Sequence, residues 1–121
     1  MIAFLPWIFL ISYNIIPIDK FKKEAKRLIR KYPSLKNELN ELNLLLTTSP
    51  TAGTALGNDS YKIRVAIKSK GAGKSGGARI ITYVISENKE VYLLTIYDKT
   101  DLESIDDKTL RKIIQSIKSE Q

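Results

Sequence analysis

The sequence predicts an α+β domain, in which a small, mostly antiparallel sheet has a helical hairpin packed on one face. Three observations lead to this prediction. Two stretches near the N-terminus place apolar residues at helical spacing, three later stretches are β-prone, and a further helical stripe comes last. With one strand before the first helix, the expected order is β-α-α-β-β-β-α. We expect a single domain over residues 12–121 of the 121-residue chain, with helices covering one face of the sheet.

The first strand and the first helix are predicted from residues 12 to 31. Residues 12–18 (SYNIIPI) are β-prone, and Asp19 suits the N-cap of a helix over about residues 20–31. One face of this helix is apolar and the opposite face is basic. The apolar face has Phe21, Ala25, Leu28, Ile29 and Tyr32, and the basic face has Lys22, Lys23, Lys26, Arg27 and Arg30.

A second helix is predicted after Pro33, which suits the first turn of a helix. Its apolar stripe continues to about residue 47, so the two helices form a hairpin with a hydrophobic inner side. The stripe consists of Leu35, Leu39, Leu42, Leu45 and Leu46. The next stretch, residues 47–60 (TTSPTAGTALGNDS), is predicted to be a loop because of its composition.

Three strands and a last helix are predicted in the remainder. Residues 61–69 (YKIRVAIKS) alternate, with Ile63, Val65 and Ile67 on one side and Lys62, Arg64, Ala66 and Lys68 on the other. A flexible, basic connection (70–77) leads to strands over 78–86 and 91–98, which form a hairpin around the turn SENKE. Asp106 or Asp107 is expected to cap the final helix. The apolar positions of that helix are Leu110, Ile113, Ile114 and Ile117.

The composition indicates a polyanionic partner. Lys and Arg number 20 against 13 Asp and Glu, for a net charge of +7, which favours binding to nucleic acid or to an anionic membrane surface. The chain has no cysteine and no histidine. This excludes disulfides, thiolate chemistry and a histidine general base, so any catalysis has to use Lys, Arg, Tyr or carboxylates.

The first eleven residues (MIAFLPWIFLI) are apolar throughout. A transmembrane helix needs about 20 such residues, and Pro6 interrupts this run. The basic start and the cleavage site of a secretory signal are also missing. Three interpretations stay open: an extension from an upstream start codon outside the fold, a lengthened first strand, or a weak membrane anchor. We expect no stable membrane association.

The segment KSKGAGKSGGAR (68–79) contains GAGKS, which resembles the end of a nucleotide-binding P-loop. In that motif the first glycine would stand at position 68, where this chain has Lys68, and a helix would follow. Here a β-prone run follows, so no helix N-terminus is available for a phosphate. The segment is instead predicted to join two strands. From residue 61 to residue 79 there are six basic and no acidic residues, which favours a surface that contacts phosphates.

Three motifs, KIRV (62–65), SGGARII (75–81) and YLLTIY (92–97), follow the basic helical hairpin in this order. Together they resemble the RelE/HigB superfamily of toxins from type II toxin–antitoxin systems, over roughly residues 12–119. The nearest pattern is that of HigB-type members with a long Gly- and Lys-rich segment between two strands. The resemblance implies a cytoplasmic toxin that enters the ribosomal A site and cleaves mRNA without a metal or another cofactor. It also implies a cognate antitoxin, often a helix-turn-helix protein, that holds the toxin inactive.

The resemblance also suggests the site residues. Arg64 would contact the scissile phosphate, and Lys62 would bind phosphate or act as the base. Arg79 would stabilise the transition state, Lys99 matches a basic residue after the last long strand, and Tyr97 could stack on a base. The remaining cations would bind the RNA backbone or the ribosome. They are Lys68, Lys70 and Lys74 in the connection, and Lys22, Lys23, Lys26, Arg27 and Arg30 on the first helix.

Each residue also has a purely structural interpretation. Lys62 and Arg64 can face solvent, Arg79 can cap the hairpin, Tyr97 can belong to the core and Lys99 can be a turn lysine. The basic helix face can simply solubilise the protein.

Two departures from the family pattern leave the general base open. Some relatives have a catalytic tyrosine in the C-terminal helix, where this chain has Ile105 nearby, and some use histidines, which this chain lacks. Two other functions fit the same architecture. One is a ParE-like gyrase inhibitor without catalysis, and the other is a basic RNA-binding module without activity. The basic strand face favours the nuclease.

Overall fold

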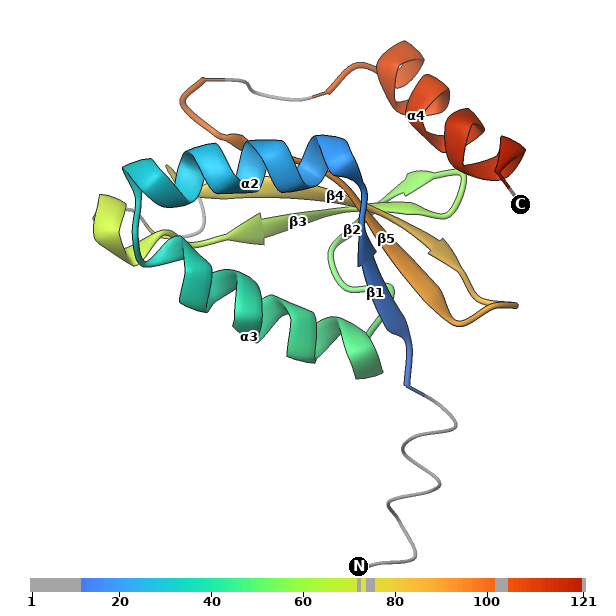
Figure 1. Cartoon of the computed structure of the whole chain (residues 1–121), viewed down its shortest axis with the longest axis horizontal. Helices are drawn as coiled ribbons and strands as arrows, with labels where there is room; N and C mark the ends of the chain where they lie inside the picture. Colours follow the sequence, from blue (N-terminus) through green and yellow to red (C-terminus); the bar gives the residue numbers. More distant parts are fainter. Residues whose placement is uncertain (1–11, 72, 74–75, 102–104, 121) are drawn as a thin grey trace, which may run out of the picture.

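A computed structural model describes residues 12–71, 73, 76–101 and 105–120 (Figure 1). Its sheet has five strands in the order β1-β5-β4-β3-β2, and only β1 is parallel to its neighbour. The strands are β1 (Asn14–Pro17), β2 (Thr54–Gly57), β3 (Ser60–Val65), β4 (Ala78–Ile85) and β5 (Glu90–Asp98). The predicted α+β class and the mostly antiparallel sheet are confirmed.

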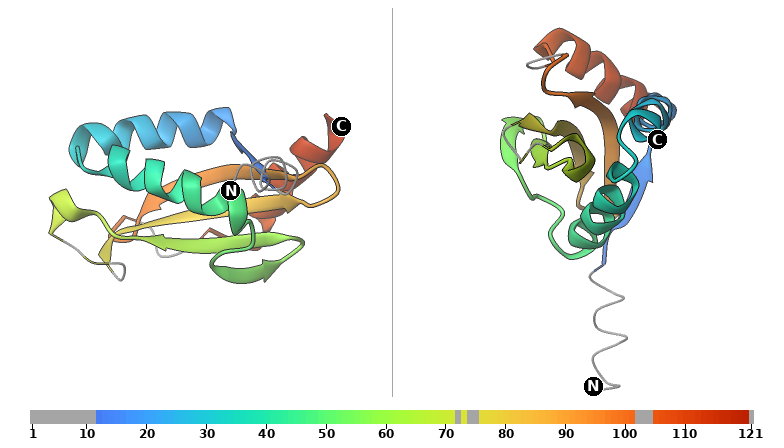
Figure 2. Two further views of the ribbon diagram at one scale, coloured as in Figure 1. Left: turned by 90° about the horizontal axis from the view of Figure 1, so that it is seen from below. Right: turned by 90° about the vertical axis from the view of Figure 1, so that its left-hand side faces the viewer.

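The predicted helical hairpin is formed by α2 (Asp19–Lys31) and α3 (Leu35–Thr48), which lie side by side in Figures 1 and 2. Both bury their apolar sides against one face of the sheet, where they pack on Ile63, Val65 and Ile80 among others. Leu45 departs from the predicted stripe, since it is 49% exposed. Ile18 is the N-cap residue of α2, so Asp19 lies in the first turn rather than at the cap. A carboxylate in the first turn still stabilises the helix through the helix dipole.

The last helix, α4 (Asp107–Ser119), corrects the expectation that helices cover a single face. Its apolar side packs on the opposite face of the sheet, against Ile81, Tyr83 and Tyr97. The reason lies in β4 and β5, whose central residues are buried on both faces. A strand that is apolar on both sides needs cover on both sides. The predicted cap is confirmed for Asp106, whose carboxylate accepts a hydrogen bond of 2.7 Å from the Thr109 N–H.

Strand β2 differs from the expectation of a loop over residues 47–60. All four of its residues are exposed, and its sequence lacks a buried side that would indicate a strand. It forms because the edge of β3 offers hydrogen-bonding partners to a two-residue hairpin. The connecting residues Asn58 and Asp59 have φ values of 54° and 60°, as a type I′ turn requires.

The segment after β3 is more ordered than predicted. Strand β3 ends at Val65 instead of residue 69, and a short 3₁₀ helix, η1 (Lys68–Lys70), follows. The predicted sidedness is confirmed, since Ile63, Val65 and Ile67 are all buried. The interpretations of residues 1–11 concern a segment outside the described residues. Within the part that the structure describes, no helix is long and apolar enough to cross a membrane.

Candidate functional site

Three of the predicted site residues form one row across the sheet. Arg64 of β3 pairs with Arg79 of β4, and Arg79 pairs in turn with Tyr97 of β5. Directly opposed residues on antiparallel strands project to the same face, with Cβ atoms about 5 Å apart. Lys62, two residues before Arg64, projects to this face as well. We call Lys62, Arg64, Arg79 and Tyr97 the cross-strand row. It lies on the face that α4 covers in part.

The cations of the row differ in exposure. Arg64 is exposed and Lys62 is half-buried, whereas Arg79 is only 4% exposed. The guanidinium of Arg79 donates a hydrogen bond of 3.1 Å to the Ala78 carbonyl oxygen. Because an arginine stays charged when it is buried, Arg79 places a fixed positive charge in the middle of the row. Two solvent-accessible cations stand beside it on β3.

Tyr97 belongs to the apolar cluster beneath α4 and is 8% exposed. Its hydroxyl has no hydrogen-bond partner among the described residues. Burial raises the pKa of this hydroxyl, and the positive charge of Arg79 offsets part of that increase. Tyr97 is therefore protonated at neutral pH and can donate a proton but not accept one. A buried ring offers little face for a base to stack on.

Lys99 follows directly after β5 and is half-buried. Its backbone N–H donates a hydrogen bond of 3.0 Å to the Gly77 carbonyl oxygen. This bond extends the β4–β5 pairing by one step beyond the strands. Gly77 is required here, because a Cβ at this position would overlap the carbonyl oxygen of Val65. Lys99 is thus held next to the row by its backbone.

Lys70 has partners that the sequence did not suggest. Its ammonium donates to the Asp98 carboxylate at 2.6 Å and to the Gly76 carbonyl oxygen at 3.1 Å, and it lies 5.6 Å from the centre of the Tyr32 ring. Asp98 is fully buried and also accepts hydrogen bonds from Tyr32 and from Thr100. This network fastens η1 to the end of β5, so Lys70 has a structural role beside the RNA-binding role predicted for it.

The opening of α3 holds the other side of η1. The Ser34 N–H donates to the Ser69 hydroxyl at 3.2 Å, and the Ser69 N–H donates to the Ser34 hydroxyl at 2.9 Å. Glu38 is 8% exposed, and its carboxylate accepts the Lys68 N–H at 2.9 Å. Residues 68–70, at the start of the connection, are therefore held from two sides.

The carboxylate of Asp98 illustrates how the network controls charge. Burial by itself raises its pKa, but the hydrogen bonds from Lys70, Thr100 and Tyr32 outweigh burial and lower the pKa to about 2. Sequence reasoning missed both Asp98 and Glu38. The only signal in the sequence was the position of Asp98 at the end of an apolar strand, and that position does not identify Lys70 as its partner.

Of the remaining predicted cations, those on α2 lie apart from the row, whereas Lys68 lies beside Arg64. The five on α2 are exposed, but α2 covers the other face of the sheet. Lys68 is exposed and lines a pocket of about 230 Å3 with Arg64, Glu38 and Glu41. Lys74 lies outside the described residues. The structure thus places two basic surfaces on the molecule, the cross-strand row and the outer side of α2 with Lys22, Lys23, Lys26, Arg27 and Arg30.

The arrangement suits the stabilisation of an anion. Among the described residues no group of three or more Asp or Glu side chains could hold a metal ion. The accessible side chains of Arg64 and Lys62 can bind the non-bridging oxygens of a phosphate, and the buried charge of Arg79 adds to the positive potential behind them. As predicted, a strand and not a helix follows the GAGKS stretch.

Comparison with known proteins identifies the fold. No protein-family model matches the sequence. Among solved structures, a double arginine-to-alanine mutant of the E. coli toxin RelE in the free state is 22% identical, with a TM-score of 0.56 over 76% of this chain and 88% of that one. The isolated E. coli RelE toxin is 21% identical, with a TM-score of 0.48 over 88% and 99% of the two chains. The first likeness shows that this chain has a RelE-like fold, as its motifs suggested.

Proposed function

We propose that this chain is the toxin of a type II toxin–antitoxin system and that it cleaves mRNA on the ribosome. The observation that supports the proposal is the cross-strand row on a RelE-like sheet. Three cations converge there on one face, and one of them is buried in a fixed position. A gyrase inhibitor or a passive RNA-binding module has no need for a buried arginine next to exposed cations.

The reaction is attack of an RNA 2′-hydroxyl on the adjacent phosphate. The bond between the 2′-oxygen and phosphorus forms while the bond to the 5′-oxygen breaks, which leaves a 2′,3′-cyclic phosphate and a free 5′-hydroxyl. Arg64 and Arg79 stabilise the charge that develops on the non-bridging oxygens. Lys62 takes the proton of the 2′-hydroxyl, and the ammonium of Lys99 protonates the leaving oxygen.

Tyr97 has a supporting role in this scheme. Its hydroxyl stays protonated, since burial raises its pKa, so it is not the base. Tyr97 is the register partner of Arg79 and packs beneath α4, so we expect its ring to keep the guanidinium in place. Tyr97 is therefore a positioning residue for Arg79.

The second basic surface is the proposed binding site for RNA outside the cross-strand row. The cations on the outer side of α2, together with Lys68, Lys70 and Lys74, are proposed to contact ribosomal RNA or the mRNA backbone near the A site. A cognate antitoxin, a helix-turn-helix type of protein, would hold the toxin inactive in the cytoplasm. The reaction scheme requires no cofactor.

The test is to map mRNA 5′ ends in cells and in cell extracts, once while translation is active and once while it is blocked. We expect cuts within translated codons that disappear when translation stops and in Arg64→Ala, whereas Lys36→Ala, at an exposed position on α3, keeps them. Intact mRNA together with arrested DNA supercoiling would establish the gyrase inhibitor instead. Intact mRNA with normal supercoiling would leave only an RNA-binding module.

A further inference from the structure

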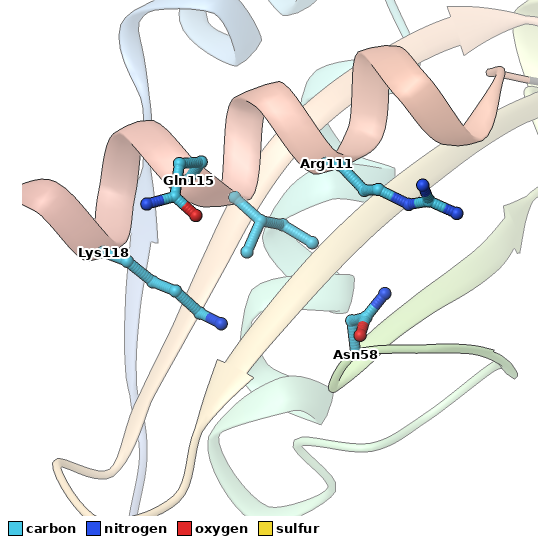
Figure 3. A pocket seen from close by; sticks show the side chains of 5 residues that line it. Asn58, Arg111, Gln115 and Lys118 are labelled. Atoms are coloured by element: carbon cyan, nitrogen blue, oxygen red, sulfur yellow. The ribbon is translucent and has the colours of Figure 1, made fainter.

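A groove of about 360 Å3 runs between α4 and the connection of β2 to β3, outside the cross-strand row. Figure 3 shows Arg111, Gln115 and Lys118 extending from α4, and Asn58 facing them from the connection. Ile114, which is 4% exposed, also lines it. A volume near the lower end of the range for ligand sites suits one small planar group.

Local structure determines how both walls are placed. Arg111, Gln115 and Lys118 are four and three residues apart, so they lie on one side of the helix. Asn58 occupies the type I′ turn with a φ of 54°, a conformation that asparagine tolerates better than most residues. Since two-residue turns of this type are tightly constrained, the carboxamide of Asn58 is presented from a defined position.

The chemistry of the lining matches the edge and face of a nucleobase. The carboxamides of Asn58 and Gln115 each carry a donor and an acceptor, as recognition of a base edge requires. The guanidinium of Arg111 can stack on a base or bind its acceptors, and the side chain of Ile114 provides an apolar wall.

The charges around the groove favour a base over a run of phosphates. The five lining residues include two cations, Arg111 and Lys118, and no carboxylate, so the groove itself admits one anionic or electron-rich group. The hollows next to it are lined by Asp107 on one side, and by Asp59 and Glu87 on another. These carboxylates would repel a polyphosphate that extended along the groove, whereas a single base between Arg111 and Asn58 avoids them.

The groove opens on the same face of the sheet as the cross-strand row, because α4 packs on that face. Asn58 lies in the turn before β3 and Lys62 is the third residue of β3, so the two are four residues apart and at most about 13 Å from each other along the chain. An RNA strand whose scissile phosphate lies at the row therefore reaches the groove within a few nucleotides.

We propose that this groove binds one unstacked base of the RNA substrate and determines the base preference near the cut. The proposal rests on the proposed function, and it assigns roles to Asn58, Arg111 and Gln115 that the cross-strand row does not supply.

The experiment measures binding of four fluorescent RNA homo-oligomers at low salt, and the base composition around mapped cuts in translating extracts. Asn58→Gly removes the carboxamide and keeps the left-handed turn, because glycine adopts this φ readily. Arg111→Ala is matched by Lys112→Ala, which removes the same charge from the next, exposed position of α4. Thermal unfolding confirms that each variant folds.

We expect the wild-type protein to prefer one base by about tenfold, and Asn58→Gly and Arg111→Ala to abolish most of this preference. Lys112→Ala should keep the preference and change all four affinities equally. The proposal would be overturned if every variant kept the base preference of the wild type, or if the wild type itself showed no base preference. The two proposals can also fail separately. If the wild type cuts no mRNA but binds RNA with a base preference that Asn58→Gly lacks, the groove binds a base and the nuclease function is wrong.

Discussion

Lys70 and Asp98 are 28 residues apart in the chain and form an ion pair with a nitrogen–oxygen distance of 2.6 Å. The pair fastens η1 to the end of β5, next to Tyr97 and Lys99. The residues that close the connection are thus adjacent in sequence to residues of the candidate site.

The ion pair predicts a loss of stability in acid. The pKa of Asp98 is about 2 in the folded protein and about 3.9 in an unfolded chain, so the unfolded state binds more protons between these values. Stability from this group, about 2 kcal/mol, is present above about pH 5 and disappears as the pH falls toward 2. Urea unfolding from pH 2 to 7 should show the wild type converging on Asp98→Asn in acid. A difference between the two that is independent of pH would contradict the assignment. Lys70→Met, which leaves the carboxylate buried and unpaired, should cost about 3 kcal/mol at pH 7.

Gly77→Ala should destabilise the protein, because its Cβ would overlap the Val65 carbonyl oxygen where β3 and β4 meet. We expect a loss of about 2 kcal/mol or more and a lower Tm by thermal unfolding. Gly73→Ala is the matched control, since a Cβ at that position meets no atom within 4 Å. Equal Tm values for the two variants would show that the close approach at Gly77 does not exist in solution.

Glu38→Gln should loosen the start of the connection. The substitution replaces a charged acceptor of the Lys68 N–H with a neutral one, and a hydrogen bond to a charged group is the stronger of the two. Hydrogen exchange should report faster exchange at the amides of Lys68 and Ser69, by roughly fivefold. Glu41→Gln, one turn away at an exposed position, should leave both amides unchanged. If both variants behave alike, the carboxylate of Glu38 does not hold this segment.

Tyr97→Phe should separate stability from activity. It removes a buried hydroxyl that has no partner among the described residues, so the free energy of unfolding should stay equal or rise by about 1 kcal/mol. Cleavage should fall by less than tenfold, because Tyr97 positions Arg79 through its ring. Tyr97→Leu should reduce cleavage further. A loss of cleavage in Tyr97→Phe as large as in Arg64→Ala would instead make the hydroxyl a catalytic group.

Much of the fold could be predicted because it follows from local patterns. Helical spacing placed the buried sides of α2, α3 and α4, and alternation placed Ile63 and Val65 inward. The sequence of β4 (ARIITYVI) has apolar residues on both faces, which is the reason that helices cover both faces and not one. The exposed β2 has no such pattern, so the sequence did not indicate it.

The candidate site divides in the same way. The sequence by itself determined which cations stand on which side of β3, because side-chain direction alternates along every strand. The tertiary structure alone decided that Arg79 is buried and that Lys70 forms an ion pair with Asp98. It also decided that α4 and Asn58 line one groove. Periodicity reflects contacts within one or two turns of chain, whereas these arrangements depend on strand register and on pairs about thirty residues apart, which no local pattern encodes.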